Sequence, residues 1–208
     1  MVGEKMSYRE FVIETSIDED PLDPREDEPV SMIFGETRRM QFSDAEVARN
    51  ISTKDCADWA AVHAKIKEIY KPCVCYDLYA LIHSGVWLSM GSFNDPWDSG
   101  QVGFIFTTKE RIKNLLGWTK LTKQRISELE KIFKKELDNY TAYINGSVYY
   151  ITAQSTYDPN VILSIGSVFD LKEGIEDIKN EIDNYYEDHP MLPNLPSEIY
   201  NMGLKSID

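Results

Sequence analysis

Residues 92–106 constrain the fold more than any other stretch, because a dense group of turn-forming residues leads there directly into an apolar run. Asp95-Pro96 and Asp98-Ser99-Gly100 both favour turns, since Asp side chains accept hydrogen bonds from nearby backbone N–H groups and Gly accepts positive φ. The stretch is therefore predicted to be an ordered turn followed by a strand. We expect Asp95 and Asp98 to bond backbone N–H groups, Trp97 to cap the core, and Gly100 and Gly103 to allow close approach.

The rest of the sequence predicts an α+β fold: one antiparallel sheet of about five to seven strands packed against three or four helices. Capping residues and apolar positions at helical spacing predict helix starts at Ser43-Asp44, at Ser52 and at Asp170, and helices over 109–116 and 122–144. Alternating, β-branched and aromatic residues predict strands at 8–15, 30–34, 73–82, 86–90, 102–107, 147–153 and 161–168. The strands between 73 and 107 are expected to form a meander.

The length of 208 residues is enough to bury roughly 70% of the unfolded surface around one core. We therefore expect a single domain over 1–188. Residues 189–208 combine three prolines with apolar side chains, and we expect them to pack on this body or on a partner.

The net charge of −13 argues against a broad nucleic-acid-binding face, which needs clustered Lys and Arg. An acidic surface instead suits solubility alone, a partner protein with a basic surface, or imitation of a nucleic acid. The charge reverses only over 109–135, where nine Lys or Arg stand against three Glu. That stretch is either a solvated helix face or a site for phosphate or an acidic partner.

Seven of the twelve residues at 18–29 are acidic and three are Pro, which predicts an extended acidic loop. No organic cofactor is expected. A divalent cation is an alternative, since Ca²⁺ prefers several flexible carboxylate oxygens, and the candidate ligands are Asp20, Asp23, Asp95 and Asp98.

Cys56, Cys73 and Cys75 are odd in number, and the last two would lie about 7 Å apart on one strand face, beyond easy disulfide reach. Reduced thiols, together with the lack of a signal-like or membrane-spanning run, predict a cytoplasmic location.

The common phosphate-loop, dinucleotide and zinc motifs are absent. Two kinds of enzyme remain as alternatives. One is a thiol nucleophile built from Cys75, His83 and Asp77. The other is a metal-dependent enzyme acting on nucleic acid or nucleotides through Asp77, Asp95 and Asp98.

Several motifs resemble those of a family of uncharacterised small proteins carried by bacteriophages, prophages and other mobile elements. They are Asp20-Pro21, Asp23-Pro24-Arg25-Glu26, Met32, His83-Ser84-Gly85, Pro96-Trp97-Asp98-Ser99-Gly100-Gln101-Val102-Gly103-Phe104-Ile105, Gly117-Trp118, Thr122-Lys123 and Tyr140-x-x-Tyr143-x-x-Gly146. Family members tend to carry an aromatic residue after Pro-Arg-Glu and an Asp before His-Ser-Gly, where this chain has Asp27 and Ile82. The resemblance implies a phage setting.

Small accessory proteins of phages often bind host or defence machinery, so the resemblance implies a counter-defence protein (anti-CRISPR or anti-restriction) or an inhibitor used in host takeover. We expect it to act by binding a host or defence protein, and a structural or regulatory homodimer is the further alternative. The candidate binding residues are Asp18, Asp20, Asp23, Arg25, Asp27, Trp97, Asp98, Glu176, Asp177 and Glu181.

Overall fold

The computed structural model of the chain describes residues 3 and 5–189, and these residues form two compact units. Unit 1 takes its described residues from both Met1–Pro21 and Val148–Asp208, whereas unit 2 is the continuous segment Leu22–Ser147. The described residues contain five α-helices and eight antiparallel strands, which confirms the α+β class. The expectation of one sheet is wrong, because the strands form two sheets of four.

The sheet of unit 2 has the order β3-β6-β4-β5. Its strands are β3 (Met32–Gly35), β4 (Val74–Ile82), β5 (Val86–Ser89) and β6 (Ser99–Thr107). Strand β6 pairs with β4 and not with β5, so the predicted meander is wrong and the chain crosses from one edge of β4 to the other. This crossing brings the end of β4 beside the beginning of β6, where Leu81 pairs with Ser99.

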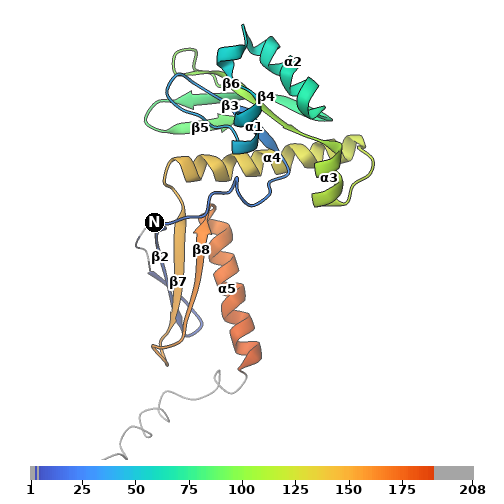
Figure 1. The fold of residues 1–208 in the computed structure, drawn as a ribbon. Helices are drawn as coiled ribbons and strands as arrows, with labels where there is room; N and C mark the ends of the chain where they lie inside the picture. Colours follow the sequence, from blue (N-terminus) through green and yellow to red (C-terminus); the bar gives the residue numbers. More distant parts are fainter. Residues whose placement is uncertain (1–2, 4, 190–208) are drawn as a thin grey trace, which may run out of the picture. The chain divides into compact units, whose positions relative to one another are not determined.

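Helices cover both faces of this sheet (Figure 1). On one face, α1 (Ala45–Asn50) and α2 (Trp59–Tyr70) pack Val47, Val62 and Ile66 against the sheet. On the other, α3 (Lys109–Leu116) and α4 (Lys123–Ile144) bury Ile112 and the α4 side chains Leu129, Phe133 and Leu137. Unit 2 is therefore a three-layer sandwich with a core on each side of the sheet.

The predicted bounds of α3 and α4 are confirmed to within a residue, and capping residues set both helix starts. Thr108 and Thr122 accept hydrogen bonds from backbone N–H groups of the first turns, and Gly117 ends α3 with φ of 68°. The predicted start at Ser52 gives only a short 3₁₀ helix, Thr53–Asp55, and α2 begins at Trp59 after the cap Asp58.

Unit 1 is a sheet of order β1-β2-β7-β8 covered on one face by α5 (Figure 1). Its elements are β1 (Lys5–Tyr8), β2 (Phe11–Ile17), β7 (Tyr149–Ser155), β8 (Ile162–Val168) and α5 (Leu171–Asp188). Phe11 and Ile13 pack with Ile178 and Ile182 in its core. The strand predicted at 8–15 is confirmed only from Phe11 onward, because the chain turns back at Arg9, whose φ is 49°, and Tyr8 belongs to β1.

The apolar segment expected over 189–208 lies outside the described residues except for His189. Among the helices of the described part, none has the length and apolar character needed to cross a membrane.

Candidate functional site

The turn at 95–98 lies between β5 and β6 and is held by its first carboxylate. Asp95 Oδ1 accepts hydrogen bonds from the backbone N–H groups of Trp97 (2.9 Å) and Asp98 (3.0 Å), as expected. These two bonds favour the ionised form and lower the pKa of Asp95. Ser99 Oγ donates to the Asp95 carbonyl, so both ends of the turn are fixed.

Asp98 has a different role from the predicted one. Its Oδ2 lies 3.1 Å from His83 Nδ1, and its backbone carbonyl accepts a hydrogen bond from Ile82 N. The pairing of β4 with β6 explains this contact, because His83 follows β4 and Asp98 precedes β6. Two motifs that are separate in the sequence thus meet at one end of the sheet.

Trp97 does not cap the core. Its side chain is 92% exposed, the largest exposed fraction among the large apolar side chains of the described residues. The preceding Asp95-Pro96 pair and the two hydrogen bonds to Asp95 hold the backbone of the turn so that the indole projects into solvent. The turn therefore presents an aromatic side chain beside two carboxylates. We call residues 95–98, with His83, the Trp97 turn.

The acidic loop is divided between the units. In unit 1, Asp18 accepts hydrogen bonds from Asp20 N and Ser167 N, and Asp20 is exposed. In unit 2, Asp23 accepts one from Arg25 N, and Asp27 is exposed. Asp18 and Asp23 thus order their own segments of the loop, and Asp20 and Asp27 are available to solvent.

Arg25 is not a surface residue, although the sequence suggests a binding role for it. Its side chain is only 5% exposed, and its Nε and Nη2 donate to the two carboxylate oxygens of Asp44 at 2.8 and 2.9 Å. Nη2 also donates to the Ser31 carbonyl, and Nη1 lies 3.6 Å from Glu136 Oε2. The guanidinium therefore joins the acidic loop, the start of α1 and helix α4.

The same arrangement explains why Asp44 does not cap α1 with its side chain. Its carboxylate accepts from Arg25 and from Ile33 N instead, while Ser43 Oγ bonds the Gly35 backbone. A predicted helix cap is thus used to connect β3 and the buried arginine.

The three candidate acids of α5 lie on the solvent side of that helix. Glu176, Asp177 and Glu181 are exposed, whereas Ile178 and Ile182 face the sheet. Glu176 pairs with Lys179 at 2.7 Å, one turn away. They form an acidic helix face that belongs to unit 1.

Two observations bear on the two enzyme alternatives. In residues 3 and 5–189, no three His, Cys, Asp or Glu side chains gather closely enough to hold a metal ion. Burial, with a smaller effect of Asp77, raises the pKa of Cys75 to about 11, which disfavours the thiolate that a nucleophile needs. His83 contacts Asp98, and Asp77 accepts a hydrogen bond from Gln101.

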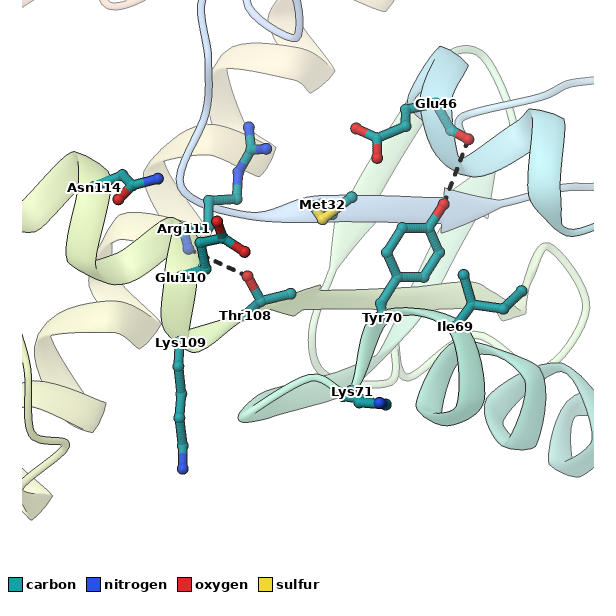
Figure 2. Close-up of a pocket in the computed structure, with 10 residues that line it drawn as sticks. All are labelled: Met32, Glu46, Ile69, Tyr70, Lys71, Thr108, Lys109, Glu110, Arg111 and Asn114. Carbon is teal, nitrogen blue, oxygen red and sulfur yellow. Dashed lines mark hydrogen bonds between the residues drawn. The ribbon is translucent and has the colours of Figure 1, made fainter.

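A pocket of about 690 Å³ lies beside the N-terminus of α3 (Figure 2). Lys71, Lys109 and Arg111 line it together with Glu46 and Glu110. Figure 2 shows Lys109 and Arg111 pointing in opposite directions, and Arg111 Nε donates to the Pro29 carbonyl. The positive charges do not converge, and two carboxylates offset them, so this pocket is not organised for one anion.

A second pocket, of about 510 Å³, lies where α3 leads into α4. Its lining is basic and partly aromatic: Lys109, Ile112, Lys113, Trp118, Thr119, Lys120 and Leu121. In the sequence, the excess of Lys and Arg over 109–135 indicates a basic surface in this region. However, that excess also includes the exposed lysines of α4, and only the fold shows which basic residues line the same cavity.

No protein-family model, curated protein or solved structure matches the chain. The resemblance of its motifs to mobile-element proteins stays a prediction.

Proposed function

We propose that this chain acts by binding a protein that has a basic surface, and that the Trp97 turn is its main contact. The observation that carries the proposal is the 92% exposure of Trp97 on a turn whose backbone is fixed by Asp95. A large apolar side chain in water gains free energy when a partner buries it, roughly 1.5 to 3 kcal/mol for a side chain of this kind.

The geometry of the turn favours a specific interface. Interface hot spots are enriched in Trp, and a side chain whose backbone is already ordered loses less entropy on binding. Asp95 and Asp98 flank the indole, so the complementary surface is an apolar recess bordered by Lys or Arg. The net charge of −13 would also attract a basic partner over a longer range and increase the association rate.

The proposed biological setting is a bacteriophage or another mobile element. The motif resemblance supports the proposal of a phage-type accessory protein, and the partner would then be a host or defence protein. Counter-defence, as an anti-CRISPR or anti-restriction protein, or inhibition of a host process would follow from blocking that partner. The acidic face of α5 would add electrostatic attraction rather than the specific contact.

The experiment compares the wild type with Trp97→Ala and with the control Ile162→Ala, which removes a 56% exposed apolar side chain from unit 1. Each protein is used to capture partners from bacterial lysate at 0.05 and 0.5 M salt, and affinities for a captured, purified partner are measured by calorimetry. We expect Trp97→Ala to weaken binding about 30-fold, which corresponds to about 2 kcal/mol, with Ile162→Ala unchanged.

Salt tests the electrostatic part, since high salt screens attraction between exposed charges. The proposal is wrong if a purified partner binds Trp97→Ala as tightly as the wild type. It is also wrong if no protein is retained by the wild type at either salt concentration.

A further inference from the structure

We propose that the pocket between α3 and α4 is a binding site for a nucleotide, with its lysines contacting the phosphates and Trp118 contacting the base. This α3–α4 pocket lies wholly within unit 2. It shares no residue with the Trp97 turn, and its proposed ligand is a small molecule and not a protein. Its volume of about 510 Å³ falls within the range of small-molecule sites in proteins.

The pocket carries uncompensated positive charge. Lys109, Lys113 and Lys120 line the pocket, and its lining contains no carboxylate. In the part of the chain that the structure describes, none of these three ammonium groups forms an ion pair, whereas Lys5, Lys134 and Lys179 each pair with a carboxylate.

Such a cluster is unexpected on a chain that carries 35 Asp and Glu against 22 Lys and Arg. Like charges around one cavity repel each other, and an anion that enters it removes this repulsion and gains attraction to all three. Phosphate oxygens are suitable partners for several Lys at once.

The same pocket also has an apolar side. Ile112, Trp118 and Leu121 line it beside the lysines, and Ile112 is only 1% exposed, so that side of the cavity is continuous with the core. The Arg125 guanidinium lies over the Trp118 ring, 5.2 Å from its centroid. An aromatic base entering the pocket stacks on or beside this fixed ring, as bases do on aromatic side chains in nucleic-acid-binding proteins.

The wall of the pocket is held in place by hydrogen bonds and helix caps. Gly117 ends α3, Thr122 caps α4, and Arg125 Nη1 donates to the Lys120 carbonyl at 2.9 Å. The connecting residues are thus held at both ends and from one side. A site that is ordered before binding loses little entropy when the ligand enters.

The combination selects the ligand class. An inorganic anion would leave the Trp118 wall unused, and a neutral aromatic compound would leave three ammonium groups uncompensated. A nucleotide has a planar base and a phosphate chain, so it satisfies both parts of the pocket.

The test is calorimetric titration of the full chain with ATP, inorganic triphosphate and adenosine, without added metal. We expect ATP to bind more tightly than triphosphate, and adenosine to bind at least tenfold more weakly than ATP. The double variant Lys113→Gln/Lys120→Gln is expected to weaken ATP binding at least tenfold. Its matched control, Lys123→Gln/Lys131→Gln, makes the same change of net charge on α4 outside the pocket and should change the affinity less than threefold.

Trp118→Leu distinguishes the contribution of the base contact from that of the phosphate contacts. It should weaken the binding of ATP and leave that of triphosphate unchanged, and circular dichroism melting checks that each variant is folded. The proposal is overturned if ATP gives no binding at millimolar concentration, if both lysine pairs have equal effects, or if triphosphate binds as tightly as ATP. Trp97→Ala should leave ATP binding unchanged, so this site and the proposed protein contact can fail separately.

Discussion

His83 Nδ1 and Asp98 Oδ2 lie 3.1 Å apart, at the place where β4 ends and β6 begins. The contact is exposed, with 75% of the His83 side chain and 42% of the Asp98 side chain accessible to water. The contact therefore belongs to the exposed Trp97 turn and not to the core.

This exposure predicts a small effect of Asp98→Ala on stability. Exposed ion pairs contribute about 0 to 1 kcal/mol, and the backbone bond from Ile82 N to the Asp98 carbonyl remains in the variant. Urea unfolding should show that the free energy of unfolding of Asp98→Ala is less than about 1 kcal/mol below that of the wild type. A larger loss would mean that the Asp98 carboxylate is essential to the turn, as the sequence alone suggests.

The hydrogen bonds to Asp95 predict a pH dependence of the turn. Folding lowers the pKa of this carboxyl, so its contribution is complete above the ordinary Asp pKa and is lost as the pH falls through the lower, folded value. The amide NMR signals of Trp97 and Asp98 should therefore move together, with a midpoint below the usual range of Asp. Asp95→Asn is the control, and a similar shift of both amides in that variant would assign the titration to another group.

Gly103 should not accept a larger side chain. A Cβ atom there would lie 1.9 Å from the Phe34 carbonyl oxygen, and a backbone neighbour in the β3–β6 pair cannot move aside. Gly103→Ala is expected to lower the free energy of unfolding by about 3 kcal/mol or more. Gly100→Ala is the matched control, because nothing lies within 4 Å of its added atom. Equal melting temperatures of the two variants would contradict the close approach of β3 to β6.

Removal of the buried guanidinium should be among the most destabilising substitutions. Arg25→Ala leaves Asp44 and Glu136, which are mostly shielded from water, without their cation, and breaking a buried pair costs about 3 to 5 kcal/mol. The control is Lys134→Ala, which breaks the exposed pair with Asp138 and should cost about 1 kcal/mol at most. Unfolding of both variants in guanidinium chloride measures the two losses of stability. Similar denaturation midpoints for Arg25→Ala and Lys134→Ala would contradict the structural role of Arg25.

Cys75 should react slowly with alkylating agents. Its pKa of about 11 leaves roughly one hundredth of the thiolate that an ordinary cysteine has near pH 8. Mass spectrometry after timed iodoacetamide treatment should show slow labelling of Cys75 in the folded protein and normal labelling in urea. Fast labelling of the folded protein would restore the thiol-nucleophile hypothesis.

Local signals in the sequence predicted much of the secondary structure. The threonines and the glycine around α3 and α4 fix those helix ends by local hydrogen bonds, so their bounds agree with the structure to within a residue. The turn at Arg9 was missed because a non-glycine residue with φ of 49° has no distinctive sequence signal.

Long-range pairings were the part that the sequence did not reveal. The residues of β5 and β6 carry no local signal that β6 pairs with the edge of β4 opposite β5. For this reason the His83–Asp98 contact and the exposure of Trp97 could not be predicted. The same reason applies to Arg25, whose partners Asp44 and Glu136 come from other segments. Its burial depends on the packing of α4.

The discontinuous origin of unit 1 has a consequence for the order of folding during synthesis. Strand β2 has to wait for its partner β7, which the ribosome makes only after all of Leu22–Ser147. Unit 2 is continuous and can fold while the later residues are still being added, since domains generally fold as units during translation. Until β7 emerges, the β1–β2 hairpin keeps an unpaired strand edge, and a chain cut short before Tyr149 would leave that edge open to other chains.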